Sequence, residues 1–200
     1  MDFSQVVRAR RTHRDFFDTP IASDQLARIV QAGTRAPSAG FTQATRILVL
    51  DRSESVRTFW ESISTPQWRA ANPARSGLDH APCIIVVLED RSAYLERYRQ
   101  PDKAYSKIDT LSDFPAPFWT IDAAFTAMMI QLAIVNEGLG YLFFGIPQGI
   151  EQLRAKFFIP PQLNPIGALA LGHPASSQPS HSSKVRRRLR NEDVIKYNHF

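Results

Sequence analysis

The chain has 200 residues, of which 44% are hydrophobic, so it can bury one sizeable core and is expected to form a single domain over residues 1–200. The formal net charge of +5 is concentrated in RARRTHR at 8–14 and KVRRRLR at 184–190, which indicates local anion sites more than a general nucleic-acid surface. The single cysteine, Cys83, excludes an intrachain disulfide framework and favours a reducing, cytoplasmic location.

The first half of the chain predicts three helices and two strands. A short helix at 2–10 ends at the arginines, and a second one at 21–33 has Ser23 or Asp24 as its N-cap and Gly33 as its stop. A buried strand at 45–51 and a helix at 52–62 follow. Residues 65–81 are rich in proline and polar residues, which predicts a long loop with a helical turn, before a second strand at 82–90.

The second half begins with a polar, poorly patterned stretch that extends to Pro117. A long helix at 118–137, closed by Gly138, comes next, and then the strands GYLFFGI and PIGALALG around the helix GIEQLRAKF. Helices interspersed with at least four strands predict the α+β class, with a mixed, mainly antiparallel sheet sandwiched by helices.

The helix at 118–137 is apolar on nearly every face, so we expect it to be buried on all sides. A small domain has little room for such a helix at its own centre, and a second subunit across a two-fold axis would supply the missing cover. The sequence therefore predicts a homodimer. The polar residues Asp122, Gln131, Asn136 and Glu137 argue against a membrane span, and the N-terminus lacks the pattern of a signal peptide.

The arginines at 8–14 allow two interpretations. They can be cations favourably placed at a helix C-terminus, where the helix dipole stabilises positive charge. Alternatively, the guanidinium forks and the Thr12 hydroxyl wrap a phosphate, with Lys184 and Arg186 closing the cradle from the other end of the chain.

Three common functional sites are not indicated by the motifs. GLGYLFFG follows a helix and has the wrong glycine spacing for a dinucleotide-binding turn, and APSAG lacks the first glycine of a serine-hydrolase elbow. The histidines at 13, 80, 173, 181 and 199 show no spacing typical of a metal site. We therefore expect no metal and no catalytic dyad.

Five segments together resemble the flavin-dependent nitroreductases. RRTHRDF is similar to the family's opening RRSxRxF, PSAGFTQATR to its PSSxNxQPWR loop, and LDHAPCIIVV to the strand after its variable loop. WTIDAAFTAMMIQLAIVNEGLG resembles the central helix that ends in GLG, and PIGALALGHPA with KVRR resembles the closing LxxLGYP and KxR. The resemblance covers nearly the whole chain, in the family's order.

This resemblance implies a nitroreductase-like fold with FMN at a homodimer interface, NADH or NADPH as reductant, and hydride transfer through flavin N5 to a nitroaromatic, quinone or similar acceptor. No side chain is expected to be catalytic, because the cofactor performs the redox chemistry. The implied cofactor-binding residues are Arg10, Arg11, Thr12, Arg14, Pro37, Ser38, Ala39, Gln43, Gly145, Ile146, Lys184 and Arg186.

The resemblance also gives these residues roles. Arg10, Arg11 and Thr12 would bind the phosphate and ribityl chain, Lys184 and Arg186 the phosphate, and Arg14 the pyrimidine edge. Pro37, Ser38 and Ala39 would reach the ring from the other subunit. Gly145 or Ile146 would donate an N–H to N5, since Pro147 has none. Phe41 and Trp68 would line the substrate pocket. The chain departs from the family's pattern at Phe41, which replaces the usual asparagine, and at Ala44 and Thr45, which replace Pro-Trp.

Two alternatives remain at this point. A protein of the same fold in which Phe41 covers the ring would bind or store flavin without catalysis. A basic protein that uses both arginine-rich segments as phosphate contacts would bind nucleic acid with a steep dependence on salt. Within the enzyme interpretation, relatives that act on flavin, halogenated tyrosines or deazaflavin-linked substrates are equally compatible with these residues.

Overall fold

The computed structural model describes residues 1–72, 77–176 and 185–200. A four-stranded sheet with strand order β1-β2-β4-β3 lies at its centre. The strands are β1 (Arg46–Leu50), β2 (Cys83–Asp90), β3 (Gly140–Phe144) and β4 (Leu163–Gly172). The helices are α1 (Phe3–Ala9), α2 (Ser23–Gly33), α3 (Ser53–Ile63), α4 (Pro66–Ala70), α5 (Arg91–Tyr98), α6 (Phe118–Asn136), α7 (Ile150–Phe157) and α9 (Asn191–Val194), with short 3-10 turns η1 (Ala39–Phe41), η3 (Pro101–Ser106) and η4 (Leu111–Asp113).

The three strand pairings of this sheet are all antiparallel. The expected mixed sheet is therefore wrong in its detail, while its mainly antiparallel character is confirmed. Strands β2 and β4 occupy the centre, and β2 is buried over nearly its whole length. A strand with neighbours on both edges and helices over both faces has no solvated side, which explains why CIIVVL is a continuous apolar run.

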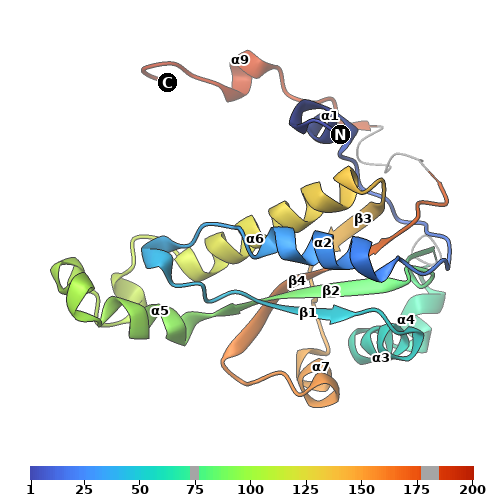
Figure 1. The fold of residues 1–200 in the computed structure, drawn as a ribbon, viewed down its shortest axis with the longest axis horizontal. Helices are drawn as coiled ribbons and strands as arrows, with labels where there is room; N and C mark the ends of the chain where they lie inside the picture. Colours follow the sequence, from blue (N-terminus) through green and yellow to red (C-terminus); the bar gives the residue numbers. More distant parts are fainter. Residues whose placement is uncertain (73–76, 177–184) are drawn as a thin grey trace.

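Helices cover both faces of the sheet (Figure 1). Helices α2 and α6 lie above it in that view, with α1 above α6, while α3 and α7 lie below it, α4 lies at its right end and α5 at its left end. The predicted α+β class, a sheet sandwiched by helices, is confirmed. The C-terminal segment with α9 extends above α1 and stands apart from the two layers.

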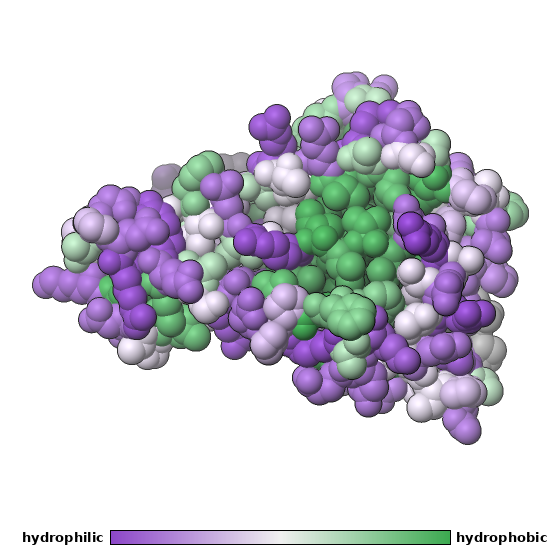
Figure 2. Space-filling model, turned by 60° about the horizontal axis from the view of Figure 1, so that its bottom comes forward, coloured by the Kyte–Doolittle hydropathy of each residue, from purple (hydrophilic) through white to green (hydrophobic). Residues whose placement is uncertain are grey.

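Two apolar clusters fill the layers on either side of the sheet. The upper cluster joins α2 and α6 to alternate residues of β2, including Ile85 and Val87, and the lower cluster joins α3 and α7 to the other residues, including Ile84 and Val86. This alternation is the period of two expected of a strand. Figure 2 shows the underside, where an apolar area at the centre is framed by hydrophilic residues. Partly buried members of the lower cluster are Leu48, Trp60, Leu142, Phe144, Ile146, Phe157 and Leu163.

Helix α6 is long and apolar enough by length and composition to cross a membrane, but here it packs on the sheet and on α2. Its buried residues are Asp122, Ala123, Thr126, Ala127, Ile130, Ile134 and Val135. Phe125 and Met128 are 46% and 44% exposed, so the expectation of burial on all sides is wrong for the single chain. The neighbouring α1 also exposes Phe3 and Val7. An apolar stripe thus remains open along α6.

Most predicted elements are confirmed within one or two residues, and two details differ. Ala22, rather than Ser23 or Asp24, is the N-cap of α2, and no side chain caps this helix end. Helix α5 lies inside the stretch that looked unpatterned. Its start was signalled by Asp90, whose Oδ1 accepts a hydrogen bond from the Ala93 N–H at 3.2 Å.

Candidate functional site

The arginine stretch 8–14 leaves α1 and crosses to strand β3. Helix α1 is fixed at its start by a capping box, in which Asp2 and Gln5 bond to each other's backbone N–H, and it ends at Ala9, so Arg10 is its C-cap. The His13 N–H then donates to the Tyr141 carbonyl at 2.8 Å. The backbone between Arg10 and His13 is therefore anchored at both ends, with the Arg11 side chain exposed and Thr12 partly buried.

Tyr141 lies beneath this stretch and was missed by the sequence interpretation. Its ring is 2% exposed, and its hydroxyl is 3.5 Å from Nη1 of the half-buried Arg10. The His13 ring packs on Gly140 so closely that a Cβ there would lie 2.8 Å from its Nδ1. The sequence signal was the position of Tyr141 directly after the GLG segment, at the start of β3.

The arginines of this stretch are free to bind an anion. Among the described residues, no salt bridge involves Arg10, Arg11 or Arg14, and Arg11 makes only a long 3.4 Å bond to the Ala9 carbonyl. Arg11 and Arg14 are exposed, and Thr12 is partly buried between them. Three guanidinium groups without a carboxylate partner form a strong donor set for a phosphate.

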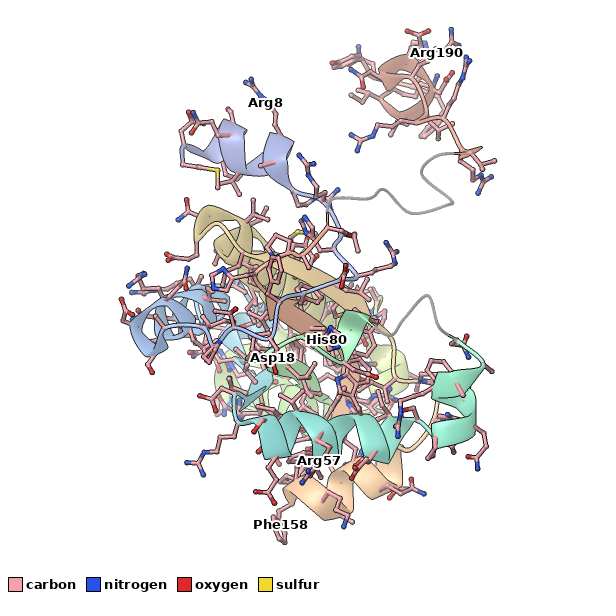
Figure 3. All side chains as sticks on the ribbon, turned by 90° about the vertical axis from the view of Figure 1, so that its right-hand side faces the viewer. Arg8, Asp18, Arg57, His80, Phe158 and Arg190 are labelled. Carbon is pink, nitrogen blue, oxygen red and sulfur yellow. The ribbon has the colours of Figure 1, made fainter. Side chains whose placement is uncertain are left out.

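The cations expected from the C-terminal end are less well placed. Lys184 lies outside the described residues. Arg186 is exposed in the C-terminal segment, and the labelled Arg190 lies far from the body of the molecule in Figure 3. In the described part of the chain, the cradle is therefore built from the N-terminal arginines.

The loop 37–43 lies at the opposite end of α6 from the arginines. Asp122, near the start of α6, accepts a hydrogen bond from the Ala39 N–H at 2.7 Å, whereas Asn136, its last residue, contacts the N-terminal ammonium group at 3.1 Å. At a rise of about 1.5 Å per residue, the 14 residues from 122 to 136 span about 21 Å. One chain therefore does not bring Pro37, Ser38, Ala39, Phe41 and Gln43 to its own Arg10.

The segment after β3 and helix α4 come together around a small pocket. Its lining includes Gly145 and Pro147 after β3, Trp68 of α4, and the rings of Trp60 and Phe144. The rings of Trp60 and Phe144 stack at 5.4 Å with an interplanar angle of 12°. Trp60 Nε1 is buried without a hydrogen-bond partner among the described residues. The structure thus joins Trp68 to Gly145, two residues that the sequence had placed near the flavin ring and the substrate.

A larger cavity of about 700 Å³ opens on the other side of Trp60, between α2 and α3. In Figure 3, Asp18 lies between these helices and Arg57 lies on α3 below it. The lining includes the carboxylates of Asp18, Asp51 and Asp79. Burial raises the pKa of Asp79, against the opposing effects of Arg69 and His80. Glu61 adds a fourth carboxylate, against the guanidinium groups of Arg57 and Arg69, so the lining is net acidic and disfavours an anionic cofactor.

Comparison with known proteins decides the family. The family model described as "Nitroreductase family" matches residues 7–173. This chain belongs to the nitroreductase family. An NADPH-dependent oxidoreductase of Staphylococcus aureus is 23% identical over 198 residues, covering 98% of this chain and 72% of the relative.

Solved nitroreductase structures share the fold. The nitroreductase CinD of Lactococcus lactis, solved in complex with chloramphenicol, superposes with a TM-score of 0.79 at 18% identity, over 99% of this chain and 100% of the other. A protein of Desulfovibrio desulfuricans described as a nitroreductase, solved in complex with FMN, gives a TM-score of 0.69 at 23% identity, over 100% and 98% of the two chains. At these identities the likeness establishes the nitroreductase fold.

Proposed function

We propose that this nitroreductase-family chain is an FMN-dependent oxidoreductase that takes hydride from NADH or NADPH and reduces a nitroaromatic, quinone or similar acceptor. The observation that carries the proposal is the unpaired guanidinium set at Arg10, Arg11 and Arg14, mounted on a nitroreductase fold. The similar proteins support this proposal. One relative is named an NADPH-dependent oxidoreductase, and two nitroreductase structures were solved in complex with FMN or with chloramphenicol.

The residues present fit FMN. Arg10 and Arg11 would bind the phosphate together with the Thr12 hydroxyl, and Tyr141 holds the Arg10 guanidinium from beneath. Arg14 would lie at the pyrimidine edge, where positive charge favours electron density on the ring. Lys184 and Arg186 would complete the phosphate site.

The other edge of the ring would face the segment after β3. Gly145 is exposed, and a Cβ at this position would meet nothing within 4 Å, so the backbone is open to a ligand. Either Gly145 or Ile146 would donate an N–H to flavin N5, because Pro147 has no N–H. Trp68 in α4, across the pocket from Gly145, would offer an aromatic surface to a planar acceptor.

When bound, FMN supplies the redox chemistry, passing two electrons and a proton between the nicotinamide and the acceptor. The side chains bind, orient and exclude water, which explains the lack of a catalytic dyad in the sequence. We assign no catalytic role to any side chain.

A homodimer would complete this site. The loop 37–43 contacts Asp122 and the N-terminus contacts Asn136, positions about 21 Å apart along α6, so Pro37, Ser38, Ala39, Phe41 and Gln43 would serve the flavin of a second copy. The open stripe of Phe125 and Met128 on α6, with Phe3 and Val7 on α1, offers the apolar surface that a stable interface buries.

The first test is the visible absorption spectrum of the purified protein, with the released chromophore identified by mass. FMN at about one per subunit, bleached anaerobically by NADH or NADPH, is the expected result. FMN that neither nicotinamide reduces would point instead to flavin storage, with the exposed ring of Phe41 over the substrate face. A colourless chain that cannot be reconstituted with FMN would overturn the proposal.

A further inference from the structure

Loop 38–43 is held in place from two sides by residues of α5 and α6. The inner anchor is Asp122, which is 4% exposed on α6. Its Oδ2 accepts hydrogen bonds from the Ala39 N–H at 2.7 Å and from the Tyr94 hydroxyl of α5. Burial, and then the hydrogen bond to Asp122, raise the pKa of Tyr94, so its hydroxyl remains protonated and donates. A buried carboxylate therefore binds the loop backbone to the core.

The outer anchor is Arg97, near the end of α5. Its Nε donates to the Gly40 carbonyl at 2.8 Å, and its two terminal nitrogens bind the Asp102 carboxylate at 2.8 and 2.7 Å. Because the guanidinium is planar, the bidentate pair with Asp102 fixes the direction in which Nε points. Tyr98 adds a steric limit, since its ring lies 2.9 Å from the position of a Cβ on Gly40.

The backbone at and directly after the anchored residues adopts an uncommon conformation. Gly40, Phe41 and Gln43 have φ values of 63°, 55° and 52°, in the left-handed region that non-glycine residues rarely occupy. Such residues persist where the surroundings over-determine them, and they cluster at ligand-binding sites. A bond from the Gln43 N–H to Ser38 Oγ at 3.0 Å closes the loop on itself.

The consequence is a rigid loop that presents one aromatic ring to the outside. Phe41 directly follows the two anchored residues, yet it is 74% exposed, and the nearby core cluster holds the ring of Tyr94 instead. The fold thus fixes the backbone of this loop at both Ala39 and Gly40 and leaves most of the Phe41 side chain exposed.

We propose that Asp122, Tyr94 and Arg97 are positioning residues, which hold loop 38–43 in the conformation that completes the flavin and acceptor site of a second copy of this chain. This role rests on the proposed function. The three residues touch neither cofactor nor acceptor; they act through the Ala39 and Gly40 backbone. Loosening the loop is expected to weaken acceptor binding more than it slows turnover, because the loop forms a wall of the site and takes no part in the chemistry.

The test is Arg97→Ala, with Arg99→Ala as the matched control. Arg99 belongs to the same helix end and donates Nη2 to the Asp109 carbonyl at 2.7 Å, away from the loop. In Arg97→Ala, amide hydrogen exchange of residues 39–43 is expected to rise about tenfold while exchange in β2 and β4 stays unchanged. The KM for the acceptor should rise about tenfold with kcat within about twofold, and the visible circular dichroism of bound FMN should change.

Each outcome decides a different part of the proposal. Unchanged exchange in Arg97→Ala would show that the outer anchor does not hold the loop. Faster exchange with an unchanged KM, in a protein that binds and reduces FMN, would overturn the positioning role. A wild-type protein without FMN would overturn the proposed function and the role together, while the exchange data would still report on the anchors. Asp122→Asn, which retains an acceptor oxygen, serves as a second variant and should shift KM less than Arg97→Ala.

Discussion

The arginine stretch 8–14 and the loop 38–43 would form opposite walls of one flavin site, yet the fold holds them in opposite ways. The loop backbone is bonded to Asp122 and Arg97, and its strained residues are fixed before any ligand arrives. The arginines have a fixed backbone but no carboxylate partners among the described residues. The loop is preorganised by intramolecular hydrogen bonds, whereas the arginine side chains are available to bind an anion. Substitutions in the loop should therefore change stability, and substitutions among the arginines should change ligand binding.

The largest effect is expected for Arg10→Ala combined with Arg186→Ala. Each lost hydrogen bond to a charged group is worth about 1.5–3 kcal/mol, so the Kd for FMN should rise at least about 100-fold. A titration of the apoprotein followed by flavin fluorescence would measure this. The urea midpoint should change little, because neither guanidinium is paired with a carboxylate among the described residues.

The control for this pair is Arg57→Ala. Arg57 is an exposed arginine of α3, and its Nε lies 4.0 Å from Glu61 Oε1. Arg57→Ala removes one positive charge, where the double variant removes two, at a site far from the proposed cradle, and it should leave the Kd unchanged. Equal FMN affinity in the double variant and the wild type would contradict the assignment of the arginines to the phosphate.

A smaller effect, on stability, is expected for Asp122→Ala. The change leaves the Ala39 N–H and the buried Tyr94 hydroxyl without their acceptor, and the free energy of unfolding should fall by about 2–4 kcal/mol. Urea denaturation would measure it. Asp122→Asn should lose clearly less, because an amide oxygen still accepts one bond; an equal loss in both variants would mean that the negative charge of the carboxylate, which asparagine lacks, and not side-chain volume, matters at this position.

A gain in stability is expected for Phe41→Asn. Asparagine tolerates the left-handed region better than phenylalanine, and little apolar surface is lost from a ring that is 74% exposed. The free energy of unfolding should rise by about 0.5–1 kcal/mol. Phe158→Asn is the matched comparison, since Phe158 has a φ of 52° and is 90% exposed at the end of α7. If Phe158→Asn raised the free energy of unfolding and Phe41→Asn did not, loop 38–43 would need its phenylalanine for its own stability.

The smallest effect concerns the pH dependence of stability at His13. Burial, and then the Arg11 charge, lower the pKa of His13 below 6.5. The unfolded chain therefore binds this proton more readily, and stability should fall as the pH drops through 6.5 towards the folded pKa. His13→Leu should reduce the difference between urea midpoints measured at about pH 7.5 and about pH 5.5. An unchanged difference would assign the pH dependence to other groups.

Parts of the fold were predictable because the signal is local. Residue type and spacing predict the strands β2 and β4 and the long helix α6. They also predict the end of that helix at Gly138, which has a φ of 77°. Helix α5 was missed because its residues carry little apolar periodicity; Asp90 capping and the packing of one buried residue, Tyr94, support it. Cys83 lies in the core, and burial raises the pKa of its thiol to about 12.

The sequence by itself determined the residue types that a phosphate requires, the order of motifs typical of the nitroreductase family, and the apolar helix at its centre. Tertiary structure alone decided that Tyr141 supports Arg10, that Asp122 and Arg97 fix loop 38–43, and that this loop lies at the other end of α6 from the arginines. The physical reason is distance along the chain. Capping, periodicity and charge act over a few residues. The hydrogen bond between Ala39 and Asp122 joins positions 83 residues apart, and it exists only once the helices have packed on the sheet.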